Sequence, residues 1–451
     1  MSLSTPQRPR LTILGTGYLG ATHAVSMAEL GYDVLGVDVD EAKIAKLSGG
    51  QVPFHEPGLD ELLRKNLTTG RLRFTTSYQE AADFGDVHFI CVGTPQKNGS
   101  KAADMTFVES AVTSLASHLT RKSLVVGKST VPVGTAEWVE QLLHKFAPDG
   151  TEVEVAWNPE FLREGFAVED TLRPDRLVFG VKTDWAREML DHTYKGVFEL
   201  ALSEDREVPV VVTDFATAEL VKVSANSFLA TKISFINAMA EVCEAAGADV
   251  TQLARAIGYD VRIGNKFLRA GVGFGGGCLP KDIRAFQARA EELGVGHALH
   301  FLSEVDLINT RRREHVVELT TRLAGGALAG VRVAALGATF KPNSDDVRDS
   351  PALAVSRMLH EAGAVVSVYD PEGTDNARRD LPEVNYAVST VEAVRSAAVV
   401  LVLTEWEEFR HADPTTLGLL VASRRVIDGR NCLDPQIWRA AGWEYHGLGR
   451  P

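Results

Sequence analysis

Cysteine is scarce in this chain, and long hydrophobic runs are missing. The four cysteines, at 91, 243, 278 and 432, lie far apart and form neither a CxxC pair nor a cluster with histidine. That spacing excludes a disulfide framework and a structural zinc site, and we expect no metal. No apolar stretch approaches the roughly 20 residues of a transmembrane helix. The first ten residues lack the apolar core of a signal peptide, so we expect a short tail and a reducing cytoplasmic location.

Basic residues are fewer than acidic ones, 47 against 60, and the formal net charge is −13. This balance argues against non-specific binding to DNA or to an anionic membrane surface. An anionic small ligand remains compatible with it, because a few local arginines and lysines can hold one. With 451 residues, of which 45% are hydrophobic, the chain is expected to form two or three globular domains.

Short apolar runs alternate with helical patterns over the first half of the chain. Such alternation is typical of a parallel, doubly wound α/β sheet. We assign residues 1–212 to this first domain. The strands expected in it are 11–14, 33–38, 86–93, 123–130, 152–160 and 176–181.

The pattern then changes to a long helix. Residues 214–246 contain no proline or glycine, which predicts one helix with Thr213 or Asp214 as its N-cap and Gly247 at its end. Helical segments continue to about Arg322 and give a central domain over 213–322. We expect a second, smaller Rossmann-like domain over 323–451, a distant structural copy of the first. Its expected elements are strands at 331–337, 365–371, 397–404 and 424–429, and a helix at 351–362.

Gly15, Gly17 and Gly20 form a G-x-G-x-x-G motif between the first strand and a helix. The first glycine permits a tight turn, the second lets a pyrophosphate approach the backbone, and the third allows close packing of helix on strand. Asp38 ends the next strand, where an acid accepts hydrogen bonds from an adenosine ribose. The acids that follow it would repel a 2′-phosphate, so we favour NAD over NADP. The alternative is a tight turn that binds nothing.

The segment GVGFGGGCLPKD, residues 271–282, holds five glycines in seven residues. A loop this costly in chain entropy indicates a close backbone approach or positive φ angles. Cys278 ends the loop at an expected helix N-terminus, one turn before Lys281 and Asp282. A thiol in that setting can act as a nucleophile. The alternative is a buried structural cysteine, which is how we interpret the other three.

Several further polar residues are candidates for binding or proton transfer. Lys222 and Asn226 share one face of the long helix, and strand ends are where α/β sheets place ligands. Each candidate has a plain alternative as a solvated or ordinary loop residue. The remaining candidates are Glu160 and Glu164 in NPEFLREG, Ser129 and Thr130 in KSTVPVG, Lys341 and Arg348 in KPNSDDVRDSP, and Arg430 in VIDGRN.

These segments together resemble the UDP-glucose/GDP-mannose dehydrogenase family, from about Leu11 to about Pro435. The matching stretches, in order, are GTGYLG, HEPGLDELL, VGTP, KSTVPVGT, NPEFLREG, AELVKVSANSFLATKISFIN, RIGNKFLRAGVGFGGGCLPKD, FKPNSDDVRDSP and VIDGRN. NPEFLREG and FGGGCLPKD favour the UDP-glucose 6-dehydrogenases within that family. Gly277 departs from the pattern, since serine is common there, and we expect little effect from this difference.

The resemblance implies an N-terminal NAD-binding domain, a central dimerisation region and a C-terminal domain that holds UDP. It also implies a four-electron oxidation at C6 of UDP-glucose. The alcohol becomes an aldehyde, Cys278 adds to form a thiohemiacetal, a second oxidation gives a thioester, and hydrolysis gives UDP-glucuronate. A plain alcohol dehydrogenase needs no thiol, whereas holding an aldehyde for a second oxidation does.

By the same resemblance, Lys222 is the base or oxyanion partner near C6, and Asn226 donates to the developing oxyanion. Asp282 and Thr130 position water, and Glu160 transfers protons. The residues implied for NAD are Gly15, Gly17, Tyr18, Leu19, Gly20, Asp38, Lys43, Thr94, Pro95, Ser129, Thr130, Glu164 and Arg348. The residues implied for the sugar nucleotide are Phe161, Leu162, Glu164, Lys222, Asn226, Arg269, Phe274, Gly275, Lys341 and Arg430, with Arg262 reaching from a partner subunit.

Three other functions compete with this interpretation. The same chemistry on UDP-N-acetylmannosamine or GDP-mannose would be separated by a substrate panel. A single-step β-hydroxyacid-type dehydrogenase would stay active without the Cys278 thiol, and the third domain argues against it. A catalytically silent NAD-binding scaffold would bind the dinucleotide without turnover.

Overall fold

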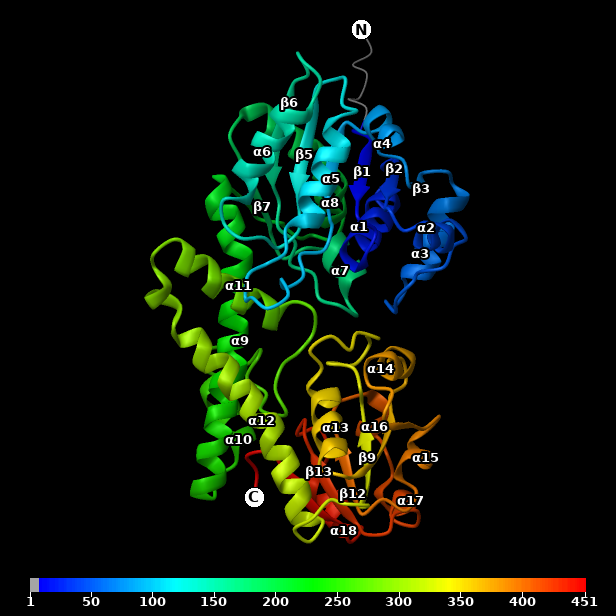
Figure 1. Cartoon of the computed structure of the whole chain (residues 1–451), viewed down its shortest axis with the longest axis vertical. Coiled ribbons are helices and arrows are strands. Elements are labelled where there is room, and N and C mark those ends of the chain that lie inside the picture. The colour runs from blue at the N-terminus through cyan, green and yellow to red at the C-terminus, as the bar shows by residue number, and fades with distance from the viewer. Residues whose placement is uncertain (1–7) are drawn as a thin grey trace. The chain divides into compact units, whose positions relative to one another are not determined.

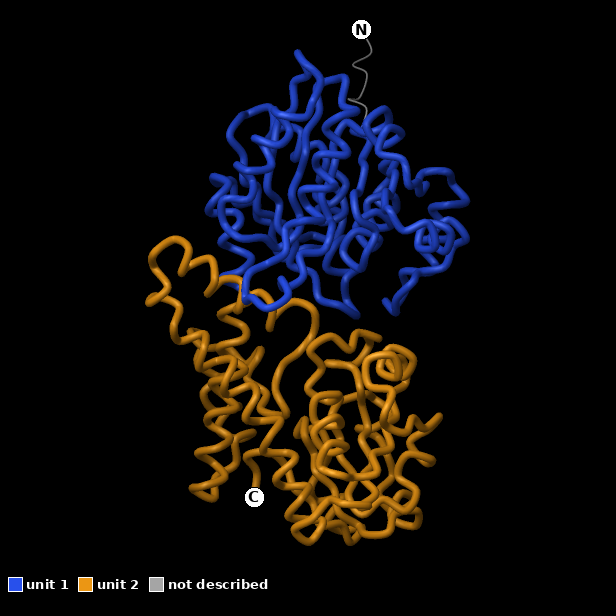
Figure 2. The backbone as a smooth tube through the Cα atoms, in the orientation of Figure 1, with its two compact units in different colours: residues 1–225 blue, residues 226–451 orange. Residues whose placement is uncertain are grey.

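The computed structural model describes residues 8–451, and most of the expected N-terminal tail lies outside them. The chain divides into two compact units, residues 1–225 and 226–451 (Figure 1 and Figure 2). Each unit contains one large sheet. Within the described residues, no helix has both the length and the hydrophobicity needed to cross a bilayer.

The sheet of the first unit has eight strands in the order β3-β2-β1-β4-β5-β6-β7-β8. β6 and β7 pair antiparallel, with Ala156 opposite Val181, while every other pair of neighbours is parallel. The expectation of a wholly parallel sheet is therefore wrong for this one pair. The strands are β1 Leu11–Leu14, β2 Val34–Val37, β3 Leu72–Thr75, β4 Val87–Ile90, β5 Ser123–Gly127, β6 Val153–Trp157, β7 Leu177–Val181 and β8 Val210–Thr213.

Two apolar clusters build the core of this unit. One contains Ile13 and Phe89, and the other contains Leu14 and Ile90. Neighbouring residues of β1 and of β4 therefore belong to different clusters, as side chains that alternate between the faces of a sheet must. The helices of the unit are α1 Tyr18–Glu29, α2 Glu41–Ser48, α3 Leu59–Thr68, α4 Tyr78–Phe84, α5 Thr106–Ala116, α6 Thr135–Phe146, α7 Ala167–Leu172 and α8 Asp184–Ser203.

The long helix is present as α9, Phe215–Ala246, and runs from the first unit into the second. Asp214 precedes it and accepts a hydrogen bond from the backbone N–H of Thr217 at 2.8 Å, which makes Asp214 the N-cap. Gly247 follows its end with φ +71°. Both predicted ends are confirmed. The other helices of this region are α10 Val250–Gly258, α11 Leu279–Glu292, the 3₁₀ turn η1 Gly296–Leu299 and α12 Phe301–Leu323.

The sheet of the second unit has six parallel strands in the order β11-β10-β9-β12-β13-β14. The strands are β9 Arg332–Leu336, β10 Val365–Tyr369, β11 Asn385–Tyr386, β12 Val399–Val402, β13 Arg425–Asp428 and β14 Glu444–Gly447. The helices are α13 Pro351–Glu361, α14 Thr374–Asp380, α15 Thr390–Val394, α16 Glu407–Arg410, α17 Pro414–Leu417 and α18 Pro435–Ala440. The first six strands of unit one have the same order, which confirms that the two α/β domains are structural copies.

The similarity between the two α/β domains extends to the turn after the first strand of each. Gly15 follows β1 and Gly337 follows β9, both with positive φ, and each donates its N–H to the last residue of the neighbouring strand. An aspartate follows the second strand in both units, Asp38 after β2 and Asp370 after β10. Asp370 is buried and accepts six hydrogen bonds from within its own unit. This acid therefore serves the fold of the second unit.

Candidate active site

The glycine turn between β1 and α1 has the shape that a dinucleotide needs. Gly15 has φ +89°, and a Cβ added to Gly20 would lie 1.8 Å from the carbonyl oxygen of Gly15. A Cβ added to Gly17, in contrast, would meet no atom within 4 Å. The first and third glycines are thus required by the fold, and the open space at the second is available to a pyrophosphate. The three glycines of this turn therefore fit the binding of NAD.

Asp38 is held in place as a charged acceptor. Its Oδ2 accepts the backbone N–H of Thr16 at 2.8 Å and the Nζ of Lys43 at 2.7 Å. Burial would raise the pKa of Asp38, but the hydrogen bonds from Lys43 and from Thr16 outweigh it and hold that pKa below its usual value. An ionised carboxylate at this position accepts ribose hydroxyls and repels a 2′-phosphate, as the preference for NAD requires.

The carboxyl ends of β4 and β5 bring the VGTP and KST segments together. The Thr94 hydroxyl donates to the Thr130 carbonyl at 2.7 Å, and the Ser129 hydroxyl donates to the Val92 carbonyl at 2.7 Å. Pro95 lies in the same connection and accepts the N–H of Asp104. Since β1 and β4 are the strands at which the sheet order reverses, these residues lie at its switch point, where open α/β sheets bind ligands.

Lys222 and Glu160 form an almost fully buried ion pair, with Nζ and Oε1 3.0 Å apart and side-chain exposures of 7% and 11%. The second oxygen of Glu160 accepts the backbone N–H of Leu162 at 2.7 Å. The Lys222 ammonium also lies 5.6 Å from the ring centroid of Phe161. Sequence reasoning named all four residues without pairing them. A lysine and a carboxylate held in contact can exchange a proton with a third group.

Glu160 and Glu164 lie in a loop, so a shared helical face does not relate them. Carboxylates fix the loop on both sides of Glu164. The backbone N–H of Arg163 donates to Asp170 at 2.8 Å, and that of Gly165 donates to Glu56 at 2.6 Å. Sequence reasoning missed Glu56, although HEPGLDELL contains it.

Two further buried groups near the β5 strand end were also missed. Glu219 on α9 accepts the backbone N–H groups of Gly134 and Ala136, at 2.7 and 2.6 Å, and burial raises its pKa to about 7. Lys128 donates to Asn158 at 2.9 Å and to Tyr194 at 3.0 Å, and burial lowers its pKa to about 8. Lys128 therefore fixes the start of the segment that carries Thr130, and Glu219 fixes its end.

The glycine-rich loop of the second unit is a tightly packed turn. Gly273 and Gly276 have φ of +103° and +86°, and a Cβ at Gly275 would lie 2.4 Å from the Asp349 carbonyl oxygen. Asn309 of α12 accepts the N–H of Phe274 and donates to its carbonyl, at 2.8 and 2.9 Å. The glycines therefore let the loop pack against its own unit.

Cys278 is the N-cap residue of α11 and is exposed. The backbone N–H of Asp282 donates to the Cys278 carbonyl at 3.0 Å, so the two residues are joined by the first turn of the helix. An N-terminal position of this kind favours a thiolate. The predicted placement of the thiol at a helix start is confirmed.

Asp282, only 2% exposed, contacts the predicted site residue Asn226 and its own neighbour Lys281. Its Oδ2 accepts the side-chain amide of Asn226 at 2.7 Å, and its Oδ1 accepts the Nζ of Lys281 at 2.5 Å. Asn226 lies on α9, one turn beyond Lys222. The amide and the carboxylate therefore form one hydrogen-bonded group with the first turn of α11.

Arg430, in contrast, is engaged by its own unit. Its guanidinium donates to the carbonyl oxygens of Leu403 at 2.7 Å, Gly273 at 2.9 Å and Phe340 at 3.0 Å. It thereby ties the glycine-rich loop to two strand ends of the second sheet. Lys341 follows Phe340 and lies 5.2 Å from its ring centroid.

Arg348 forms a bidentate pair with Asp346 and lies over Gly277. A Cβ at Gly277 would come within 2.3 Å of the Arg348 Cζ, so a serine there would require this exposed guanidinium to move. Because this guanidinium is the exposed end of a flexible side chain, the expectation that Gly277 matters little stays a prediction. Arg262 is paired with Asp260 on the surface, and the largely exposed side chain of Arg269 faces Glu405 at 4.0 Å.

The other three cysteines differ from Cys278 in their surroundings. Burial raises the pKa of the thiols of Cys91, Cys243 and Cys432, that of Cys91 to about 12. A protonated, enclosed thiol is a poor nucleophile. This supports their interpretation as structural residues.

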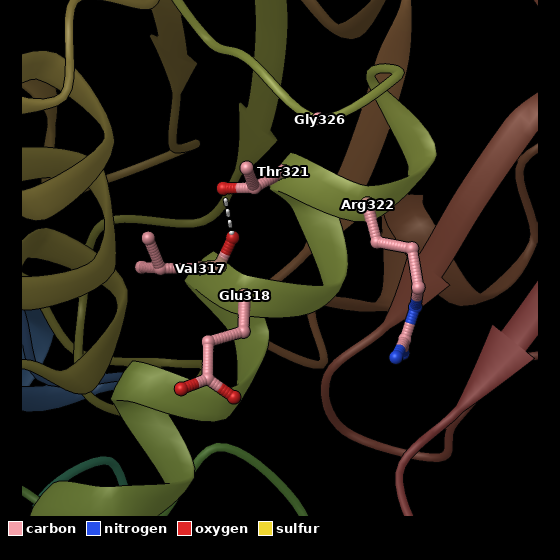
Figure 3. A pocket seen from close by; sticks show the side chains of 5 residues that line it. All are labelled: Val317, Glu318, Thr321, Arg322 and Gly326. Atoms are coloured by element: carbon pink, nitrogen blue, oxygen red, sulfur yellow. Dashed lines mark hydrogen bonds between the residues drawn. The ribbon is translucent and has the colours of Figure 1, made fainter.

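An open pocket of about 580 Å³ lies at the C-terminal end of α12 (Figure 3). It is lined by Val317, Glu318, Thr321, Arg322 and Gly326. The Thr321 hydroxyl is turned back onto its own helix and donates to the Val317 carbonyl at 2.8 Å. None of these five residues belongs to the predicted site, and we assign the pocket no role.

Three features are together typical of the nucleotide-linked dehydrogenases. They are the glycine turn for a dinucleotide, the ionised carboxylate of Asp38 for the ribose hydroxyls, and the thiol of Cys278 at a helix start. Comparison with known proteins narrows this class. The NAD binding, central and UDP binding domain models of one family match residues 9–198, 216–311 and 334–435. The chain belongs to the UDP-glucose/GDP-mannose dehydrogenase family.

Individual relatives match over the full length. The UDP-glucose 6-dehydrogenase of Rhizobium meliloti (strain 1021) is 42% identical over 98% of this chain and all of its own. UDP-glucose 6-dehydrogenase YwqF of Bacillus subtilis (strain 168) is 38% identical over 98% of this chain and 97% of its own. The structure of a UDP-glucose dehydrogenase from the archaeon Pyrobaculum islandicum superposes with a TM-score of 0.90 at 36% identity and covers both chains completely.

Proposed function

We propose that this protein oxidises UDP-glucose to UDP-glucuronate with two NAD⁺ and one water per sugar. The observation that carries the proposal is the N-cap position of Cys278, one helical turn from the Asn226–Asp282 pair, in a chain that also has an NAD turn. A thiol placed to hold an aldehyde is useful to a double oxidation and has no use in a single one. The family and the names of the full-length relatives support the same substrate.

The first oxidation requires a hydride acceptor, a proton acceptor and a donor to the oxygen on C6. NAD⁺, held by the glycine turn and Asp38, would supply the hydride acceptor for each of the two oxidations at C6. Lys222, once its ammonium has passed a proton to Glu160, takes the proton of the C6 hydroxyl in the first oxidation, and Glu160 then releases its proton to water. Asn226 donates to the oxygen on C6 as negative charge develops there, and Lys222 stabilises the same charge.

The thiol chemistry follows from the position of Cys278. Its thiolate adds to the C6 aldehyde and forms a C–S bond, and the resulting thiohemiacetal loses a hydride to become a thioester. Water, positioned by Asp282 and Thr130, attacks the thioester carbon while Glu160 accepts a proton. The C–S bond breaks, the acid leaves, and the thiolate is restored. A reducing cytoplasm suits this cycle, because the thiol must remain unoxidised between turnovers.

The proposed division of the chain assigns 1–212 to NAD, 213–322 to the central helices and 323–451 to UDP. The ranges of the three family models support these boundaries. The further residues proposed to bind the sugar nucleotide are Phe161, Leu162, Glu164, Arg269, Phe274, Gly275, Lys341 and Arg430. For Arg430 the role includes holding the glycine-rich loop, since it donates to the Gly273 carbonyl.

The yield of NADH at limiting UDP-glucose and excess NAD⁺ tests the function. We expect about two NADH per sugar, read by absorbance, with UDP-glucuronate identified by chromatography. One NADH per sugar would indicate a single-step alcohol dehydrogenase and remove the role of Cys278. If UDP-glucose gave no NADH, UDP-N-acetylmannosamine and GDP-mannose would be tried next. No turnover of any of them, with intact NAD binding, would indicate a silent scaffold.

We also propose a homodimer formed through α9. Phe228, Phe235 and Val242 recur every seven residues on this helix and are 67%, 48% and 57% exposed. Residues at that spacing lie along one helix face, and an apolar stripe of this kind is costly to leave in water. In the dimer, Arg262 would reach the partner's sugar site.

Light scattering after size exclusion checks the dimer. The wild-type protein is expected at twice the chain mass of 48.9 kDa, and Phe235→Glu at the monomer mass, because a charge in an apolar interface is unfavourable. Phe107→Glu, at an equally exposed phenylalanine on α5, is the control and should remain dimeric. A monomeric wild type, or a dimeric Phe235→Glu, would contradict the proposal.

A further inference from the structure

Glu56 is a buried carboxylate that contacts two functional segments at once. It lies in the loop between α2 and α3 and is 6% exposed. Its Oε2 accepts the Tyr18 hydroxyl and the Gly165 N–H, the latter at 2.6 Å, and its Oε1 accepts the Ala167 N–H at 2.8 Å. Tyr18 belongs to the dinucleotide turn, and Gly165 ends NPEFLREG.

The three groups form one closed cluster. The Gly165 N–H also lies 2.8 Å from the Tyr18 oxygen, so phenol, carboxylate and amide are mutually bonded. The Tyr18 ring lies 4.7 Å from the ring of Phe54, two residues before Glu56. Burial, together with the hydrogen bond to Glu56, raises the pKa of Tyr18, so the phenol keeps the proton that it donates.

This cluster fixes the backbone beside Glu164. With Gly165 bonded to Glu56 and Arg163 bonded to Asp170, the residue between them has little freedom to shift. On the Tyr18 side, the neighbouring Gly17 is the position with open space for the pyrophosphate. A ligand that orders the glycine turn therefore also orders the partner of Glu56.

We propose that Glu56 is a positioning residue that couples the occupancy of the dinucleotide turn to the order of the loop Glu160–Ala167. The coupling runs from Tyr18 through the Glu56 carboxylate to the amides of Gly165 and Ala167. It rests on the proposed function for the meaning of that loop, as the segment that presents Glu160 and Glu164 to the sugar. The physical link itself needs only NAD binding.

Glutamine cannot replace Glu56 in this cluster. Each carboxylate oxygen accepts at least one backbone N–H, whereas a glutamine amide has one accepting oxygen and one donating nitrogen. In Glu56→Gln, the NH₂ group of the glutamine would therefore face the backbone N–H of Gly165 or that of Ala167, which places two donors opposite each other. Tyr18→Phe is milder, since it removes the phenol and leaves both backbone hydrogen bonds to Glu56.

Hydrogen exchange of the peptide covering residues 160–172, with and without saturating NADH, tests the coupling. In the wild type we expect NADH to slow exchange at this peptide at least about fivefold, the lower end of ordinary coupling between sites. In Glu56→Gln and in Tyr18→Phe the NADH-dependent change should be lost at NADH concentrations that a fluorescence titration of each variant shows to be saturating. The double variant should lose no more than either single variant.

Glu29→Gln is the matched control. Glu29 lies on α1, as Tyr18 does, and joins α1 to α3 through Lys65 at 2.6 Å and Asn66 at 3.0 Å, but at the helix end away from the turn. It should keep the full NADH effect. The inference is overturned if NADH leaves the wild-type peptide unchanged, if Tyr18→Phe keeps the protection, or if Glu29→Gln loses it. Failure of UDP-glucose turnover would count against the proposed function alone, because this readout uses no sugar.

Discussion

Cys278→Ser should bind UDP-glucose normally and fail to release UDP-glucuronate, with a loss of at least about 1,000-fold in the steady-state rate. A serine hydroxyl at the N-cap of α11 is ionised far less than a thiol, so it adds poorly to an aldehyde. The first oxidation does not use the thiol. The variant should therefore accumulate aldehyde-level or stalled adduct species, with at most about one NADH per site in a single turnover.

Each expectation has its own measurement. Calorimetry reports UDP-glucose binding, rapid absorbance reports the NADH formed in a single turnover, and chromatography reports the release of UDP-glucuronate. Cys432→Ser is the matched control, because Cys432 lies in the same unit with its thiol turned to Asp428 at 3.6 Å. That control should retain turnover. Wild-type rates of UDP-glucuronate formation by Cys278→Ser would refute the role of the thiol.

Lys222→Met should lower kcat by about 100- to 10,000-fold, with little change in the KM for UDP-glucose, since proton transfer and oxyanion stabilisation act at the transition state. Methionine preserves the length of the side chain and removes the charge. The Glu160 carboxylate would then be left unpaired at 11% exposure, and the melting temperature should fall as well.

A double variant separates catalysis from stability. Lys222→Met with Glu160→Gln removes both charges, so it should regain much of the melting temperature and remain inactive. Recovery of activity in the double variant would show that the lysine only balances a buried charge. Lys182→Met breaks the exposed pair with Glu140, at 2.7 Å, and should change neither quantity, because exposed ion pairs contribute little.

Local sequence was sufficient to locate the principal strands, the long helix and the start of the helix at Cys278. Each depends on a short-range signal, such as the N-cap at Asp214, the glycine after Ala246, or the glycine turn after β1. Strand direction is not such a signal. The apolar residues of β7 would suit a parallel or an antiparallel strand equally well. Only the pairing of β7 with β6 shows that it runs antiparallel.

Candidate site residues could be named from the sequence, but the contacts between them could not. Lys222 and Glu160 were both named, yet they are 62 positions apart, and only the folded chain brings Nζ and Oε1 together. Glu56 and Glu219 were missed because a glutamate that accepts backbone amides leaves no pattern in its own neighbourhood. Arg430 was named as a residue for the sugar nucleotide, and that role stays a prediction. Its three carbonyl partners, one of them in the glycine-rich loop, depend on how the second sheet packs.

The two aspartates that follow β2 and β10 occupy the same position in the fold and differ in their surroundings. Both aspartates accept hydrogen bonds from the protein at both oxygens, but Asp38 lies beside a turn with open space for a ligand, whereas Asp370 is enclosed within its own unit. Variation at Asp38 would change which dinucleotide is preferred, and it would also remove the hydrogen bonds that Thr16 of the glycine turn donates to this carboxylate. Variation at Asp370 would reduce the amount of folded protein before any ligand was involved. A search for altered cofactor use should therefore vary the first aspartate and leave its structural counterpart unchanged.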